Sequence, residues 1–331
     1  MESVIITEFM DEEGVEALRP DFDVHYDPQL VDKPDELRTR LADCRGLIVR
    51  NRTQVNTSLL IAAPRLKVVG RLGVGLDNID LAACAAREIP VLPATGTNDQ
   101  TVAEFVMGAI AMLARGGAYH VTPEVIAGKW PRTKVKGRDI RGLRLGLIGF
   151  GAIARQVAVR ARSFGMPLAA FDPFVDRDQA VWQQYAVAPR DIDTLMEGSD
   201  VVSVHVPLTD KTRDLLDSRR LHLLPRGAFV INTARGQVVN EQDLVDALHS
   251  GHLGGAFLDV MEQEPLRDGS IFGGVPNLYL SPHIAGITHE AVLRASLLTA
   301  ENVSLVLKGK RAKVEDAAAV LQNAFPRCPC R

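Results

Sequence analysis

Three side chains that can bind an anion and move a proton lie in the second half of the chain. Arg235, Glu264 and His283 each follow a short apolar run by a few residues. Histidine titrates near neutral pH, and an ionised carboxylate beside it favours the imidazolium. Arginine can hold a carboxylate through two parallel hydrogen bonds. The three residue types predict a site that orients a carboxylic acid and exchanges one proton with it.

A glycine-rich segment precedes these residues. A short apolar run ends at Gly149, and a helical pattern starts just after Gly151, so the segment reads as strand, turn and helix with the spacing G-x-G-x-x-A. The first glycine permits the tight turn, the second lets a pyrophosphate approach the backbone, and Ala154 allows close packing of helix on strand. The amides of Ala152 and Ile153 are then expected to face the phosphates.

A second apolar run ends at Asp172, twenty-one residues after Gly151. In dinucleotide-binding domains, an acidic residue at about this distance hydrogen-bonds the adenosine ribose. Pro173 follows the aspartate and no arginine adjoins it, which favours NAD over NADP. The two segments together predict an NAD site.

Length and composition limit the number of domains and the other classes of protein that the chain could belong to. The chain has 331 residues, which predicts about two domains, and its net charge is −3. This charge gives no reason to expect nucleic acid, and no apolar stretch is long enough to span a membrane. The scattered cysteines and the absence of a signal-peptide pattern predict a cytoplasmic protein. The pair Cys328 and Cys330 lacks further ligands, so no metal site is predicted.

Strand and helix patterns alternate in both halves, which predicts α/β domains with parallel sheets. A helix over 101–115 is apolar on nearly every face, so it is either the interior helix of one domain or part of a subunit or domain interface. Residues 116–141 read as a connecting region. A long helix over 288–307 is expected to return to the first domain. The predicted parts are a substrate domain at 1–99, an NAD-binding domain at 100–286, and a returning helix with a tail at 287–331.

Several motifs occur together in one order along nearly the whole chain. They are Gly149-Phe150-Gly151 with Asp172, and the segments 204–209, 232–236, 259–265 and 281–286. With these motifs the chain resembles the D-2-hydroxyacid dehydrogenase family. Residues 71–80 further resemble its 3-phosphoglycerate dehydrogenase branch. Residues 6–11, 50–54 and 130–132 are similar to bacterial proteins assigned as sulfolactate dehydrogenases.

The resemblance implies a doubly wound Rossmann NAD domain, a smaller flavodoxin-like substrate domain that is discontinuous in sequence, and a homodimer built on the NAD domain. It implies that Arg235 binds the carboxylate and that Glu264 and His283 form the acid–base pair. His205 is expected to be structural. The expected cofactor-binding residues are Gly149, Gly151, Ala152, Ile153, Asp172, Val206, Pro207, Thr233, Ala234, Asp259, Ala285 and Gly286. The expected substrate-binding residues are Arg50, Arg52, Arg71, Leu72, Gly73, Val74, Arg235 and His283.

The identity of the acid depends on three arginines of the first domain. Arg50, Arg52 and Arg71 either converge on one surface, which favours a second anionic group on the substrate, or lie separately in solvent. The leading interpretation is an NAD-dependent dehydrogenase of a D-configured 2-hydroxy acid that resembles 3-phosphoglycerate or 3-sulfolactate. The alternatives are a glyoxylate or hydroxypyruvate reductase, and a non-catalytic NADH-sensing protein of the corepressor type.

Overall fold

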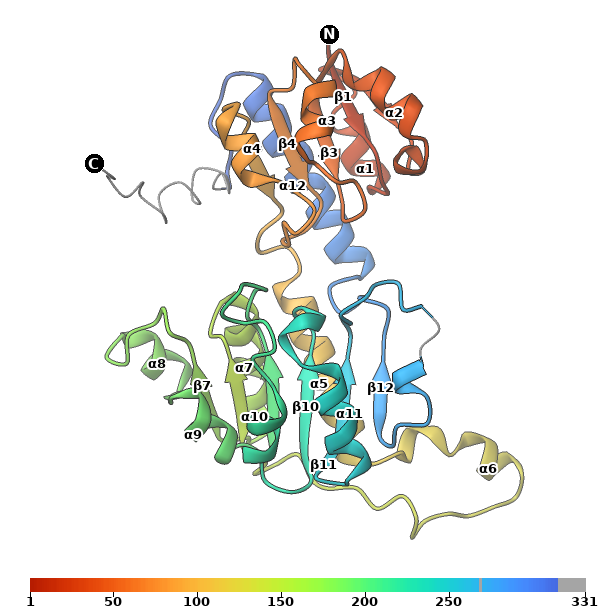
Figure 1. The fold of residues 1–331 in the computed structure, drawn as a ribbon, viewed down its shortest axis with the longest axis vertical. Coiled ribbons are helices and arrows are strands. Elements are labelled where there is room, and N and C mark those ends of the chain that lie inside the picture. Colours follow the sequence, from red (N-terminus) through yellow and green to blue (C-terminus); the bar gives the residue numbers. More distant parts are fainter. Residues whose placement is uncertain (268–269, 315–331) are drawn as a thin grey trace. The chain divides into compact units, whose positions relative to one another are not determined.

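The computed structural model describes residues 1–267 and 270–314 and divides into two compact units (Figure 1). One unit contains residues 1–98 and the described part of the segment after residue 286. The other contains residues 99–286. Each unit has one sheet whose paired strands are all parallel, which confirms the predicted α/β fold class. Cys328 and Cys330 lie outside the described residues.

The first unit is built on a five-stranded sheet with the order β2-β1-β3-β4-β5, the flavodoxin-like arrangement. Helices α1 and α12 cover one face, and α2, α3 and α4 cover the other. The strands are β1 (Glu2–Ile6), β2 (Phe22–Tyr26), β3 (Cys44–Val49), β4 (Val68–Arg71) and β5 (Val91–Pro93). The helices are α1 (Glu12–Glu16), η1 (Leu30–Asp32), α2 (Pro34–Leu41), α3 (Thr57–Ala62), α4 (Leu81–Ala86) and α12 (His289–Leu307).

Helix α12 packs closely on this first sheet, although it is the last described helix of the chain. Thr288 caps it by accepting a hydrogen bond from the backbone N–H of Ala291. Glycine permits the close approach, because a Cβ at Gly70 would lie 2.7 Å from Val303 Cγ2. The helix therefore completes the core of a sheet whose last strand ends almost 200 residues before it.

The second unit has a seven-stranded sheet with the order β12-β11-β10-β9-β6-β7-β8, so that the direction of strand addition reverses between β6 and β9. The strands are β6 (Leu145–Ile148), β7 (Leu168–Phe171), β8 (Ala188–Pro189), β9 (Val201–Val204), β10 (Ala228–Asn232), β11 (Leu253–Leu258) and β12 (Leu278–Leu280). The helices are α5 (Asp99–Arg115), η2 (Ala118–His120), α6 (Thr122–Ile126), α7 (Ala152–Ser163), α8 (Ala180–Tyr185), α9 (Ile192–Glu197), α10 (Ser218–Leu223), η3 (Gly236–Val238), α11 (Glu241–His249) and η4 (Ser270–Phe272).

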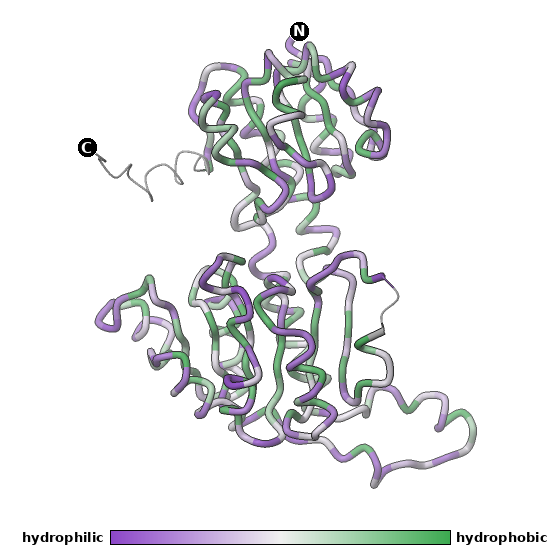
Figure 2. Tube along the Cα trace, in the orientation of Figure 1, coloured by the Kyte–Doolittle hydropathy of each residue, from purple (hydrophilic) through white to green (hydrophobic). Residues whose placement is uncertain are grey.

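Helices cover both faces of this sheet. Helices α5, α7 and α8 share one apolar core with it, and α9, α10 and α11 share the other. Figure 2 shows apolar residues along the central strands of both sheets. This is the pattern expected for strands buried on both faces.

The apolar helix predicted at 101–115 is α5, which starts two residues earlier, at Asp99. It buries nine side chains against α7, β10 and β11 of its own unit. Its exposed positions include Glu104, Gly108 and Arg115. Burial inside one unit therefore accounts for most of its apolar surface, as the first of the two sequence interpretations proposed.

The segment 116–141, expected only to connect, contains the short helix α6. Pro123 in its first turn suits a helix start, because proline lacks the N–H that is unpaired there. The segment exposes large apolar side chains at Tyr119, Ile126 and Trp130. Within the described ranges, no helix is both long and apolar enough to cross a membrane.

Candidate active site

The glycine-rich turn joins β6 to α7 at the edge of the sheet where parallel strands end. Gly149 has a φ of +89°, and a Cβ there would lie 2.7 Å from the carbonyl oxygen of His205. Gly151 is the N-cap of α7, no side chain caps the helix, and the space where its Cβ would lie is open. Ala152 is exposed and Ile153 partly exposed. The first amides of a twelve-residue helix are therefore open to an anion, as a pyrophosphate requires.

Asp172 lies at the end of the neighbouring strand β7 and faces this turn. Its Oδ2 accepts a hydrogen bond from Phe150 N at 2.8 Å, and its Oδ1 accepts one from Phe174 N at 2.9 Å. The side chain is partly exposed, so its remaining lone pairs can accept ribose hydroxyl groups. The turn, the open helix end and this carboxylate fit NAD.

We expect the Asp172→Ala variant to bind NADH about 10- to 100-fold more weakly, the effect of losing hydrogen bonds to a charged group. NADPH should lose less, because the carboxylate no longer repels its 2′-phosphate. Fluorescence titration with both nucleotides measures the change. Asp176→Ala, which removes the same charge from an exposed position four residues away, is the control. Equal losses for both nucleotides would show that Asp172 only supports the turn.

Arg235 lies on a turn that is folded by the buried side chain of Asn232 at the end of β10. Asn232 accepts a hydrogen bond from Ala234 N at 3.0 Å and donates one to the carbonyl oxygen of Arg235 at 2.8 Å. A Cβ at Gly236 would lie 1.9 Å from the carbonyl carbon of Met261. Only glycine at this position lets the turn with Arg235 approach the loop that carries Glu264.

Glu264 and His283 form a hydrogen-bonded pair. His283 Nδ1 lies 2.7 Å from Glu264 Oε2, and the other carboxylate oxygen accepts a hydrogen bond from Met261 N at 3.0 Å. About 44% of the His283 side chain and 34% of the Glu264 side chain are exposed, so a small molecule can reach the pair. With Nδ1 directed at the carboxylate, Nε2 is the ring nitrogen that can face a reacting oxygen.

The pKa of Glu264 is lowered from its usual value. Burial raises it, but the hydrogen bonds from His283 and Met261 and the positive charges of His283 and Arg235 together outweigh burial. The carboxylate is therefore ionised at neutral pH and can stabilise a positive charge on His283.

The loop that carries His283 is held by Asp259, which is 1% exposed at the end of β11. Asp259 Oδ1 accepts hydrogen bonds from Ser281 Oγ at 2.6 Å and Ile284 N at 2.9 Å, and Oδ2 accepts one from Ala285 N at 2.8 Å. His283 has a φ of +56°, which is rare for a residue with a side chain. Asp259, predicted to line the cofactor site, binds one side chain and two backbone amides of the loop that carries His283.

His205 and Thr233 follow paired positions of β9 and β10, at the same edge of the sheet. Burial lowers the pKa of His205 to about 4, so its ring is neutral at neutral pH. Among the described residues, neither His205 Nε2 nor Thr233 Oγ1 has a hydrogen-bond partner, and both atoms are buried. His205 thus has the properties of a neutral buried histidine rather than of a proton carrier.

Other predicted cofactor residues occupy the same edge of the second sheet. Val206 is 9% exposed and Ala285 is 3% exposed, so each contributes little besides its backbone. Pro207 is exposed, and its carbonyl oxygen accepts a hydrogen bond from Thr212 Oγ1 at 2.7 Å. Gly286 is the last residue of the second unit.

The predicted substrate residues of the first unit lie at the corresponding edge of the first sheet. Arg50 follows β3 and Arg71 ends β4, and the two strands are paired side by side. Arg71 Nη1 donates a hydrogen bond to Leu72 O at 2.8 Å, and Gly73 has a φ of +142°. Arg52 instead forms a two-point ion pair with Asp32. The structure thus brings Arg50 and Arg71 to one edge and directs Arg52 to another partner.

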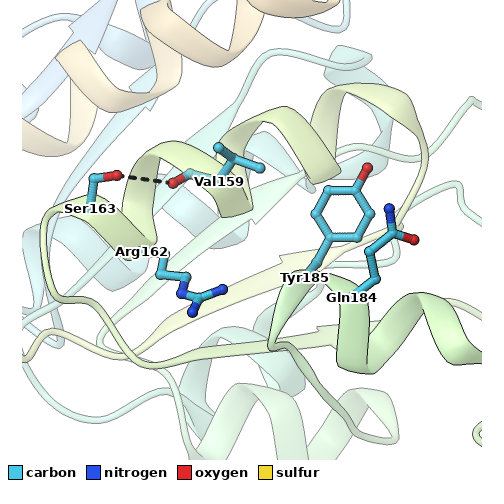
Figure 3. Close-up of a pocket in the computed structure, with 5 residues that line it drawn as sticks. All are labelled: Val159, Arg162, Ser163, Gln184 and Tyr185. Atoms are coloured by element: carbon cyan, nitrogen blue, oxygen red, sulfur yellow. Dashed lines mark hydrogen bonds between the residues drawn. The ribbon is translucent and has the colours of Figure 1, made fainter.

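A hollow of about 570 Å³ lies elsewhere, between α7 and α8 (Figure 3). Val159, Arg162 and Ser163 line it from the last turns of α7, with Gln184 and Tyr185 from α8. The three α7 residues are about 10–16 Å along α7 from its N-terminal end, at 1.5 Å per residue. The hollow is not part of the predicted site. In the parts of the chain that are described, no cluster of three or more His, Cys, Asp or Glu side chains could hold a metal ion.

Sequence reasoning missed four residues that hold these loops: Glu8, Asn232, Gly236 and Ser281. The one signal that could have indicated Glu8 is an acidic residue two positions after an apolar strand. Asn232 makes local hydrogen bonds with Ala234 and Arg235, which an asparagine at the end of a strand could have indicated. The roles of Gly236 and Ser281 follow from tertiary contacts that no local pattern reports.

The doubly wound sheet, the open helix end and Asp172 define a dinucleotide-binding protein, and comparison with known proteins gives its family. Residues 107–285 match the model of the D-isomer specific 2-hydroxyacid dehydrogenase, NAD binding domain. A (S)-sulfolactate dehydrogenase from Chromohalobacter salexigens is 51% identical over 93% of this chain and 99% of its own length. The chain belongs to the D-isomer-specific 2-hydroxyacid dehydrogenase family, as the sequence motifs predicted.

Two further relatives show how far this similarity extends. A D-3-phosphoglycerate dehydrogenase from Methanocaldococcus jannaschii is 34% identical over 95% of this chain, which spans only 59% of that relative's length. The crystal structure of D-lactate dehydrogenase from Aquifex aeolicus, complexed with NAD and lactic acid, covers 92% of this chain and 96% of its own, with a TM-score of 0.80 and 27% identity. These similarities confirm the predicted enzyme class and NAD as its cofactor.

Proposed function

We propose that this enzyme interconverts a D-configured 2-hydroxy acid that carries a second anion, of the 3-sulfolactate type, and its 2-keto acid. The observation that carries the acid–base part of this proposal is the 2.7 Å contact between His283 and Glu264. The 51% identical relative named for (S)-sulfolactate supports the choice of acid.

NAD, held by the glycine-rich turn at 149–151 and by Asp172, would supply the hydride acceptor for C2 of the hydroxy acid and, in its reduced form, the hydride donor for the keto acid. In oxidation, His283 takes the proton of the C2 hydroxyl group through Nε2, and in reduction it donates that proton to the keto oxygen. The ionised Glu264 stabilises the imidazolium that results. Arg235 binds the substrate carboxylate and orients C2. The backbone amides of Leu72, Gly73 and Val74 are proposed to bind the same carboxylate.

The (S) prefix of the sulfolactate enzyme agrees with a D-specific family. In lactate the carboxylate outranks the C3 methyl group, so the D form is labelled R. In sulfolactate the carbon that bears sulfur outranks the carboxylate, so the same spatial arrangement is labelled S. A site built for D-2-hydroxy acids therefore accepts (S)-sulfolactate without changing the face from which hydride leaves.

We further propose that the enzyme is a cytoplasmic homodimer. The buried residues Cys44 and Cys84 are not disulfide-bonded, which is compatible with a reducing compartment. The exposed side chains of Tyr119, Ile126 and Trp130 supply apolar surface on the NAD-binding unit that a second copy could cover.

The test is NADH oxidation with sulfopyruvate, 3-phosphohydroxypyruvate, hydroxypyruvate and glyoxylate, with the His283→Ala enzyme as the blank. We expect the highest kcat/KM with sulfopyruvate. A highest value with glyoxylate or hydroxypyruvate would replace this proposal with a simple reductase. NADH binding without turnover of any keto acid would favour a sensor.

A further inference from the structure

Glu8 is a buried carboxylate for which the reaction described above has no use. It lies two residues beyond β1 and is 4% exposed. Its two oxygens accept hydrogen bonds from four consecutive backbone amides, those of Arg50 at 2.9 Å, Asn51 at 3.2 Å, Arg52 at 2.9 Å and Thr53 at 3.0 Å. One side chain thus fixes the whole loop that follows β3.

Two further contacts hold the end of this loop. Thr53 Oγ1 lies 2.7 Å from Thr7 Oγ1, so the residue before Glu8 binds the loop as well. Asn78 Nδ2 donates a hydrogen bond to Thr53 O at 2.7 Å and a longer one to Arg50 O at 3.4 Å. Burial raises the pKa of Glu8, but the amide hydrogen bonds together lower it below its usual value, so it stays ionised.

The loop presents its two arginines differently. Arg50 packs its guanidinium against Phe9, with Cζ 5.8 Å from the ring centroid and Nη1 3.4 Å from the Phe9 carbonyl oxygen. Arg52 is turned to Asp32 and forms a two-point ion pair with it. Of the two arginines, only Arg52 thus has a carboxylate directly on its guanidinium.

The loop also lies where the first sheet reverses its order. In the order β2-β1-β3-β4-β5 the reversal falls between β1 and β3, and Glu8 and Arg50 follow these two strands. Ligands of open α/β sheets bind beyond the carboxyl ends of the strands at such a point. The position of the loop alone therefore marks it as a ligand site.

We propose that Glu8 is the positioning residue of a subsite for the second anion of the substrate. It shapes the loop so that Arg50, and not Arg52, meets that anion. This inference rests on the proposed function, because it concerns the group on C3 that distinguishes sulfolactate from a simple hydroxy acid.

The charges of the loop favour a sulfonate over a phosphate. Arg50 and Arg52 are balanced by Glu8 and Asp32, so these four side chains have no net formal charge. A phosphate monoester carries a charge of about −1.5 to −2 at pH 7. A sulfonate carries a single charge. Arg71, at the end of the paired strand β4, adds one positive charge at this edge of the sheet. The resulting net formal charge of one matches a sulfonate better than a phosphate.

Glu8→Gln provides a test in which positioning and electrostatics predict opposite changes in the KM for sulfopyruvate. Removing a negative charge near an anion site should by itself strengthen binding. If Glu8 positions Arg50, the loss of the shared acceptor should instead raise the KM for sulfopyruvate, by about tenfold or more relative to the KM for hydroxypyruvate, the scale of one charged hydrogen bond. Asp32→Asn removes the same charge from a residue of η1 that contacts this loop only through Arg52, and it should not raise the KM.

The outcomes separate this inference from the proposed function. If the native enzyme does not prefer sulfopyruvate to hydroxypyruvate, the proposed function is wrong. If it does and Glu8→Gln leaves that preference unchanged or increases it, the role of Glu8 is wrong. Should Glu8→Gln fail to fold, Glu8→Asp keeps the charge but is too short to reach all four amides. It should reduce the preference for sulfopyruvate, and an unchanged preference would contradict the proposal.

Discussion

In the His283→Ala variant, turnover of the keto acid is expected to fall by about 10²–10⁴-fold, the usual contribution of a general acid. NADH should still bind, because the glycine-rich turn and Asp172 lie on other strands of the sheet. Steady-state rates at saturating keto acid measure the first effect, and fluorescence titration measures the second.

The control for this variant concerns the backbone, because His283 has a φ of +56°. Asparagine adopts this left-handed conformation more readily than other residues with side chains. His283→Asn should therefore keep the loop conformation and lose the same turnover as His283→Ala. Near-native turnover in either variant would rule out His283 as the proton carrier.

The second large effect is expected in Asp259→Asn, which leaves His283 unchanged. Asp259 accepts hydrogen bonds from Ser281, Ile284 and Ala285, on both sides of the histidine. The asparagine amide directs its NH₂ group at one of these three donors. Because two donors cannot pair, that donor is left without a hydrogen bond. A displacement of about 1 Å at the reacting groups can cost about 10²-fold in rate, and we expect a loss of turnover of this order.

Ser281→Ala is the graded control for Asp259→Asn. It removes one of the three hydrogen bonds and leaves both backbone amides paired with the carboxylate. Its turnover should fall much less than that of Asp259→Asn. If Asp259→Asn weakens NADH binding and leaves turnover at saturating NADH unchanged, Asp259 acts on the cofactor and not on the loop of His283.

The parts of the fold that sequence predicted well depend on local signals. A short apolar run, two glycines and a helical pattern are enough to place the turn after β6, and Asp172 follows at the expected distance. The residues Arg235, Glu264 and His283 were predicted to share one site because each follows a strand, and parallel strands end at one edge. The family motifs then strengthened each of these predictions.

The parts that sequence did not predict depend on contacts between distant residues. Glu8 binds amides more than forty positions away, and Asp259 binds a loop more than twenty positions away. Neither partner can be read from a spacing. For α5, an apolar pattern on nearly every face fits an interior helix and an interface equally well. Packing on α7 and on two strands of its own unit accounts for most of its burial.

The placement of α12 has a consequence for synthesis of the chain on the ribosome. Val4 and Ile6 of β1 and Val68 of β4 share a core with Val303 and Leu307 of α12. Translation of the nearly 200 residues between β5 and α12 takes about 10–40 s at 5–20 residues per second. During that time the apolar face of the nascent first sheet has α1 but lacks α12, and the inserted 99–286 unit is complete before α12 is made. The first strands to leave the ribosome are therefore among the last to be shielded from water, and chaperones that bind apolar surface have their clearest opportunity there.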